Sequence, residues 1–188
     1  MEGIKLVEYK DESYLPEIQR LVAKDLSEPY SVFTYRYFLH KWPQLCMCAF
    51  DESTEDDDGE GTQSGNVGGD EGGGSGERKE IEVGTSSAAD SGEVVVADAG
   101  DRKGKGKMIG TIICKAEFEH NAFRGYIGML TVSESYRKRG IGLKLAQIGI
   151  DKMVAEGCTE IVLETEMSNK GALNLYGRLG FSREERLP

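Results

Sequence analysis

Three cations and two glycines stand together in the segment YRKRGIG, residues 136–142. An apolar, strand-like run precedes the segment, and a helix-like stretch follows it. The unpaired N–H groups and the dipole of a helix N-terminus attract anions, and glycines let the backbone approach closely. Arginines at this place can add charge-assisted hydrogen bonds. The spacing therefore predicts a phosphate-binding turn between a strand and a helix.

Two known phosphate loops do not match this turn. A nucleotide P-loop ends in glycine, lysine and serine or threonine, whereas Leu143 and Lys144 follow the last glycine here. The dinucleotide fingerprint needs a third small residue at the position of Leu145. A basic solvent-exposed turn is the alternative interpretation, and the two glycines at a strand-to-helix junction favour the anion site.

The charge of the chain is unevenly distributed. The net charge is −10, and residues 51–107 account for all of it, with 16 acidic and 6 basic side chains. The same segment holds 14 of the 25 glycines and no aromatic residue, so it cannot bury enough apolar surface to offset the entropy of ordering. We expect one domain over residues 1–188 with 51–107 as an acidic, glycine-rich disordered insertion. The neutral remainder can still bind anions.

Hydrophobic periodicity predicts an α/β fold with a mixed sheet. The expected strands cover residues 3–9, 43–50, 108–118, 123–132 and 159–166, and the expected helices cover 12–26, 31–42, 142–156 and 168–180. We expect a turn at 119–122, Ser168 as the N-cap of the last helix, and an extended segment from 181.

The four cysteines have no zinc-site spacing, and the chain has no signal-peptide pattern or apolar run of membrane length. Buried reduced thiols are the expected state, which points to a cytoplasmic protein.

Two motifs in order resemble the GCN5-related N-acetyltransferases (GNAT). RKRGIG resembles the family's R/Q-x-x-G-x-G/A motif, carried by Arg137, Lys138, Arg139, Gly140, Ile141 and Gly142. SNKGALNLYGRLGF resembles its N-x-x-A-x-x-L-Y-x-x-x-G-F helix, carried by Asn169, Ala172, Leu175, Tyr176, Gly180 and Phe181. The resemblance implies the GNAT fold, acetyl-CoA as acetyl donor with its pyrophosphate on the first motif, and no metal.

Three longer segments, 25–45, 124–132 and 162–176, resemble the catalytic subunits of NatC-type N-terminal acetyltransferases. The resemblance implies nascent polypeptides that start with Met and a bulky apolar residue as substrates. It also implies a large auxiliary subunit, a small Sm-like subunit, and contact with the ribosome through them. Neither nucleic acid nor membrane is expected as a direct partner. We expect the C-terminal strand hairpin of the family to be missing from this chain.

The resemblance implies direct transfer to an amine, which needs a base. We expect Glu164 in this role, because a carboxylate at the end of a buried strand can be partly desolvated, which raises its pKa. Glu166 is the competing base, and a solvated strand-end carboxylate is the alternative for Glu164. Tyr176 is expected to protonate or orient the departing CoA thiolate, with core packing as its alternative. Tyr126 is expected to hold the peptide N-terminus or a water.

The resemblance also implies binding residues. The backbone of Leu130, Thr131 and Val132 is expected along the pantetheine arm, and Asn169 near it. Glu28, Pro29 and Tyr30 resemble the family's substrate loop. Two further hypotheses remain: an acetyltransferase of this fold acting on lysine or a small amine, and a catalytically weak form that binds acyl-CoA and auxiliary subunits.

Overall fold

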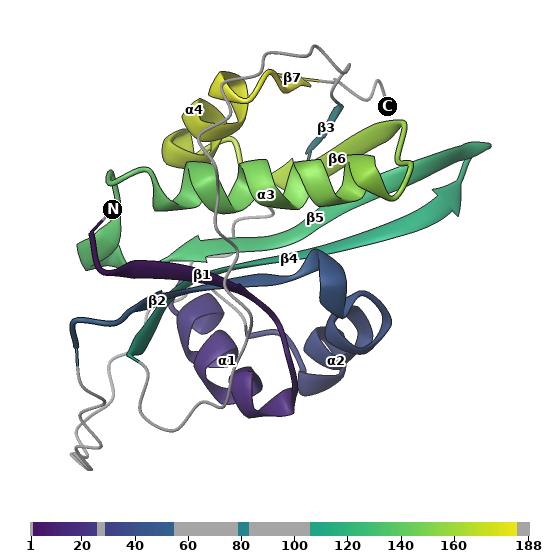
Figure 1. Ribbon diagram of the computed structural model, residues 1–188. Coiled ribbons are helices and arrows are strands. Elements are labelled where there is room, and N and C mark those ends of the chain that lie inside the picture. The colour runs from purple at the N-terminus through teal and green to yellow at the C-terminus, as the bar shows by residue number, and fades with distance from the viewer. Residues whose placement is uncertain (1, 26–28, 55–78, 83–105, 184–188) are drawn as a thin grey trace, which may run out of the picture.

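The computed structural model describes residues 2–25, 29–54, 79–82 and 106–183 (Figure 1). Its centre is a mixed sheet in the order β1-β2-β4-β5-β6-β3-β7. The strands are β1 (Ile4–Glu8), β2 (Met47–Asp51), β3 (Lys79–Glu82), β4 (Lys107–Glu119), β5 (Ala122–Val132), β6 (Glu160–Thr165) and β7 (Ser182–Arg183). Among the described strands, β5 and β6 form the parallel pair and the other neighbours are antiparallel. The expected mixed α/β sheet is confirmed.

The helices cover both faces of this sheet. Figure 1 shows α1 and α2 on one face, and α3 and α4 on the other. They are α1 (Leu15–Ala23), α2 (Val32–Lys41), α3 (Ile141–Ala155) and α4 (Lys170–Arg178), with short 3-10 turns at Glu12–Tyr14, Pro43–Leu45 and Glu134–Tyr136. The sheet is therefore the middle layer of three.

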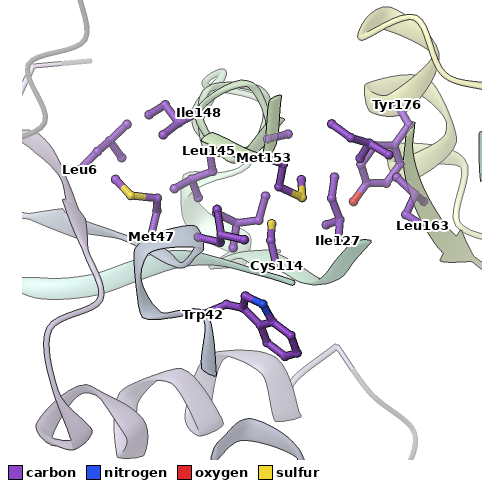
Figure 2. Packing of buried hydrophobic residues seen from close by; sticks show 14 of the residues in the cluster. Leu6, Trp42, Met47, Cys114, Ile127, Leu145, Ile148, Met153, Leu163 and Tyr176 are labelled. Atoms are coloured by element: carbon purple, nitrogen blue, oxygen red, sulfur yellow. The ribbon is translucent and has the colours of Figure 1, made fainter. Parts of the chain in front are cut away.

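Each face of the sheet carries its own core. Along β2 the side chains alternate: Met47 and Ala49 join the cluster beneath α3, while Cys48 and Phe50 join the cluster beneath α1 and α2. We name these the α3-side core and the α1-side core. Figure 2 shows the α3-side core, in which Leu145 and Met153 of α3 meet Met47 and Cys114 of the sheet.

Local chemistry explains where the first helix begins and where β4 turns into β5. The predicted helix over 12–26 is divided, because Asp11 accepts a bond from the Ser13 amide at 2.9 Å and caps a 3-10 turn before α1. Between β4 and β5 the turn is shorter than the predicted 119–122. His120 and Asn121 form it alone with φ of 47° and 65°, a left-handed conformation that asparagine tolerates well.

Three short parts of the predicted insertion, residues 51–107, lie within the described structure. Asp51 is the last residue of β2, residues 79–82 form β3 between β6 and β7, and Lys107 begins β4. The backbone of β3 pairs with an edge of β6 that would otherwise expose unpaired N–H and C=O groups. Residues 55–78 and 83–105, and the extended segment after residue 183, lie outside the described residues.

All four cysteines are free and buried, as predicted. Burial raises the pKa of Cys46 to about 12 and that of Cys158 to about 11, and it holds the pKa of Cys114 well above its usual value. Since the thiolate is the reactive form, these thiols should be inert in the folded protein.

We therefore predict that a thiol reagent such as Ellman's reagent labels the native protein at pH 8 at least about a hundredfold more slowly than the urea-unfolded protein. A control with free glutathione fixes the intrinsic rate. Rapid labelling of one thiol in native protein would show that the core around that cysteine opens readily.

Candidate active site

The predicted phosphate-binding turn lies between the end of β5 and the start of α3. The Ser133 amide donates to the Ile109 carbonyl at 2.7 Å, which fixes the beginning of the turn against β4. Lys138 and Gly140 have φ of 60° and 81°, both in the left-handed region. Two such residues bend the chain sharply enough for α3 to begin at Ile141.

The first turn of α3 has no side-chain cap, because its N-cap residue is Gly140. The first amide of the helix that bonds back within it is that of Lys144, which donates to the Gly140 carbonyl at 3.0 Å. The amides of residues 141–143 therefore point out of the helix end, as an anion site requires. No atom lies within 4 Å of the place a Cβ would occupy on Gly140, whereas one on Gly142 would lie 3.2 Å from Leu175 of α4.

The three cations are exposed beside this helix end, and both arginines are held in place. The Arg137 Nη2 lies 2.6 Å from the Asp25 carboxylate, and its Nε donates to the Val132 carbonyl at 3.0 Å. The Arg139 guanidinium lies 5.0 Å from the centre of the Tyr136 ring.

Tyr136 is in turn anchored to the end of β2. Its hydroxyl donates to Asp51 at 2.7 Å. Hydrogen bonds from Ser53 and then from Tyr136 lower the pKa of Asp51 below its usual value, so the carboxylate stays charged at neutral pH. Asp25, Asp51 and Tyr136 were not among the sequence-predicted site residues.

Beside this turn, β5 and β6 separate. Their parallel ladder ends at the pair Ile127 and Leu163, although β5 continues to Val132. Gly128 is the extra residue of a β-bulge opposite β4, and a Cβ there would lie 2.9 Å from the Phe38 ring. A bulge bends its strand, which accounts for the separation at this point. Beyond the bulge, β5 continues through Leu130, Thr131 and Val132, which pair with β4.

Glu164 lies one residue past the end of that ladder. Ile161 and Leu163 belong to the α3-side core, so Val162 and Glu164 point to the opposite face. The partner of Val162 across the ladder is Tyr126, which packs against the α1-side core. Glu164 and Tyr126 are therefore brought to one face.

The expected desolvation of Glu164 is not found, because its side chain is exposed at the strand end. Glu166 is also exposed and lies beyond the last residue of β6, where it accepts a bond from the Ser168 hydroxyl at 3.2 Å. Side chains alternate between the two faces only within a strand, so this rule places Glu164 and does not place Glu166. Glu164 is therefore favoured as the carboxylate that points to the α1-side face.

Tyr176 approaches the strand separation from the other face. It is buried in the α3-side core, and its ring packs edge-on against Phe181 with centroids 5.4 Å apart. Figure 2 shows its side chain extending from α4 towards Ile127 and Leu163, the last pair of the ladder. Burial, and secondarily the neighbouring Cys114, raises the pKa of the Tyr176 phenol, so it stays protonated at neutral pH.

The N-cap of α4 is Asn169 rather than the predicted Ser168. Its side-chain oxygen accepts a bond from the Ala172 amide at 3.0 Å. The capping bond uses the oxygen of the Asn169 side chain and leaves its NH₂ group as a donor.

The predicted substrate loop is described in part. Tyr30 is half-buried against the α1-side core, where its ring lies edge-on to Tyr35 with centroids 6.1 Å apart. Tyr126 packs against the same core. Pro29 is exposed, and Glu28 lies outside the described residues.

The described residues contain no group of three or more metal-ligating side chains that could hold an ion. No helix among them combines the length and apolar character needed to cross a bilayer.

Comparison with known proteins identifies the family of this chain. Residues 73–181 match the acetyltransferase (GNAT) family. The chain is 40% identical over 184 residues to N-alpha-acetyltransferase MAK3 of Arabidopsis thaliana, an alignment that covers 98% of this chain and 69% of that protein. The chain belongs to the GNAT acetyltransferase family. The resemblance inferred from the two sequence motifs is thus confirmed.

Two further relatives define the group within the family. The chain is 38% identical over 185 residues to human N-alpha-acetyltransferase 30, of which it spans 36%. The crystal structure of the NatC complex bound to Gag peptide and CoA contains a chain that is 35% identical, with a TM-score of 0.67 and coverage of 98% of this chain and 88% of that one. This chain is an N-alpha-acetyltransferase of the type these relatives represent.

The family implies acetyl-CoA as donor, and the turn fits its pyrophosphate. The helix end lacks a side-chain cap, the space around Gly140 is open, and three cations surround it. An anion with two phosphate groups can satisfy the outward amides and the cations together.

We predict that Gly140→Val raises the KM for acetyl-CoA about tenfold or more, corresponding to at least ~1.4 kcal/mol of lost binding. A branched side chain is strained at a φ of 81° and fills the space open to the anion. Steady-state kinetics with varied acetyl-CoA measures the effect.

Gly157→Val is the matched control. Gly157 also has a left-handed φ, of 100°, and open space, but it follows the other end of α3. The Gly157→Val variant should lose about as much thermal stability as Gly140→Val and keep the KM of the unsubstituted protein for acetyl-CoA. Equal changes of this KM in the two variants would contradict the assignment of the turn before α3 as the pyrophosphate site.

Proposed function

We propose that this chain transfers an acetyl group from acetyl-CoA to the α-amine of peptides that start with Met and a bulky apolar residue. This is the NatC type of N-terminal acetylation. The observation that carries the proposal is the placement of the uncapped turn of α3 beside the separation of β5 from β6. The similarity to the NatC complex bound to Gag peptide and CoA supports it.

The donor occupies the turn and the gap between the strands. Its pyrophosphate binds the backbone of Gly140, Ile141 and Gly142, with Arg137, Lys138 and Arg139 around it. The pantetheine arm follows the backbone of Leu130–Val132, whose edge β6 leaves at the bulge. The NH₂ group of Asn169 lies at the start of α4 and donates to the arm or to a water.

The peptide binds on the α1-side face. Glu164 and Tyr126 point to this face, and Tyr30 borders the same core. Glu28 and Pro29 complete the proposed substrate loop with Tyr30. The aromatic rings that line this side suit the apolar first two residues of the peptide.

The reaction is attack of the free amine on the thioester carbonyl carbon. A new C–N bond forms, the C–S bond breaks, and the amine proton passes to Glu164, directly or through a water. An α-amine has an ordinary pKa of about 7.7–8.0, so a base is needed at neutral pH. Tyr176, kept protonated by burial, donates its proton to the CoA thiolate from the opposite face.

This arrangement explains why the two groups lie on different faces of the sheet. Ile127 and Leu163 mark the end of the ladder, Glu164 follows it on one side, and Tyr176 reaches it from the other. A thioester threaded through the gap meets its base on the peptide side and its acid on the core side.

The proposal extends to partners and location. As a NatC-type catalytic subunit, the chain would act in the cytoplasm with a large auxiliary subunit and a small Sm-like subunit, which bring it to nascent chains on the ribosome. We also infer that residues 1–188 form one domain interrupted at 51–107.

A peptide panel with free N-termini tests the proposed function. We expect acetylation of a Met-Leu peptide at least about tenfold faster than of a Ser-Glu peptide, since one well-filled apolar pocket discriminates by about 1–3 kcal/mol. An N-terminally blocked peptide with an internal lysine is the control. Equal rates for the two free N-termini, or faster lysine acetylation, would favour the lysine or small-amine alternative. Acetyl-CoA binding without turnover would favour the catalytically weak form.

Glu164→Gln tests the base. The amide keeps the shape but cannot accept a proton, so kcat should fall about 10²–10⁴-fold while the Kd for acetyl-CoA stays within twofold. Glu166→Gln is the matched control and should keep most of the rate. Full activity of Glu164→Gln would refute its role as base.

A further inference from the structure

The ring of Tyr136 lies between a buried carboxylate and one of the three cations of the turn before α3. Its hydroxyl donates to Oδ2 of Asp51 at 2.7 Å, and the Arg139 guanidinium lies 5.0 Å from the centre of its ring. The face of an aromatic ring attracts a cation. Tyr136 therefore connects the end of β2 to the cation that directly precedes Gly140.

Asp51 is a fixed anchor for this ring. Its backbone lies within the sheet, opposite Ile4 of β1 on one side and Lys107 of β4 on the other. Its second carboxylate oxygen, Oδ1, accepts from the amide of Ser53 at 2.9 Å and from the hydroxyl of Ser53 at 2.5 Å. Because both oxygens accept hydrogen bonds and the residue is buried, the position of the carboxylate is fixed, and with it that of the Tyr136 hydroxyl.

The two arginines of the turn are held in different ways. Arg137 is held by hydrogen bonds, from Nε to the Val132 carbonyl and from Nη2 to the Asp25 carboxylate. Arg139 is held by the face of the Tyr136 ring, and such a contact uses none of the five N–H donors of a guanidinium. Within the part of the chain that the structure describes, no carboxylate forms an ion pair with Arg139. Its full set of donors is therefore available to an anion.

The place of Arg139 in the turn suits an anion bound at the start of α3. Its backbone lies between Lys138 and Gly140, whose φ angles of 60° and 81° are both left-handed. The amides of residues 141–143, directly after it, point out of the helix end. A guanidinium held beside these amides can add charge-assisted hydrogen bonds to the same phosphate group or to a neighbouring one.

We propose that Tyr136 is a positioning residue for the donor: its ring, oriented by Asp51, holds the Arg139 guanidinium ready to bind a phosphate group of acetyl-CoA. The inference rests on the proposed function in one respect, the placement of the donor at the turn before α3. A freely moving arginine loses side-chain entropy when it binds a ligand, and the ring removes part of that cost before the donor arrives.

Calorimetry with CoA measures this role through the Kd, without turnover. We expect Tyr136→Leu, which removes the ring, to raise the Kd for CoA about threefold to tenfold. Arg139→Gln should raise this Kd at least as much. In the Arg139→Gln background, Tyr136→Leu should have no further effect, because the ring acts through this arginine.

Tyr136→Phe separates the ring from its anchor. The variant keeps the aromatic face and loses only the hydrogen bond to Asp51. It should therefore raise the Kd for CoA by less than Tyr136→Leu does.

Shortened ligands identify the phosphate group that Arg139 binds. Dephospho-CoA lacks the 3′-phosphate and keeps the pyrophosphate, whereas pantetheine lacks every phosphate group. An effect of Tyr136→Leu that persists with dephospho-CoA assigns Arg139 to the pyrophosphate, and an effect that disappears assigns it to the 3′-phosphate. Pantetheine should bind Tyr136→Leu and the unsubstituted protein equally well.

Tyr37→Leu is the control. Tyr37 of α2 also lies beneath an exposed cation, with the Lys41 Nζ 5.1 Å from the centre of its ring. Figure 1 shows α2 on the face of the sheet opposite α3. The Tyr37→Leu variant should keep the Kd of the unsubstituted protein for CoA.

Three results would overturn the inference: an unchanged Kd for CoA in Tyr136→Leu, an equal increase with and without Arg139, or an equal loss of affinity for pantetheine. In the last two cases the ring would act only through the fold of the turn. Failure of the donor placement itself is distinguishable, because Arg137→Gln and Gly140→Val would then also leave the Kd for CoA unchanged.

Discussion

The uncapped first turn of α3 is the constraint around which the rest of the site is arranged. A helix end without a side-chain partner leaves amides that must bond to water or to a ligand. To place this end beside β5, the chain ends that strand at Val132 and turns through two left-handed residues, Lys138 and Gly140. Asp25 contacts the turn through Arg137, and Asp51 contacts it through Tyr136.

The second constraint is the separation of the parallel strands. The bulge at Gly128 bends β5 away from β6, and the Phe38 ring occupies the space that a side chain would need there. Opening the sheet at this point exposes a backbone edge and connects the two faces. In the proposed mechanism, Glu164 and Tyr176 therefore serve one reaction although they belong to opposite sides of the sheet.

Much of the fold and part of the candidate site could be predicted from the sequence, because they depend on local patterns of residues. Features that depend on contacts between distant residues could not. Local periodicity gave the order of strands and helices, and the glycine spacing identified the turn before α3. The exposure of Glu164, the cap at Asn169 in place of Ser168, and the pairing of residues 79–82 depend on three-dimensional neighbours. The contacts of Asp25 with Arg137 and of Asp51 with Tyr136 join residues 112 and 85 positions apart, and no local pattern predicts such pairs.

Hydrogen exchange at the amides of residues 141–143 tests the central claim most directly. These amides lack helical partners, so they should exchange rapidly in the free protein, and saturating CoA should slow them at least about tenfold. Pantetheine, which lacks the pyrophosphate, should leave the exchange rates of these amides nearly unchanged. Unaltered exchange at all three amides in the presence of bound CoA would contradict the account.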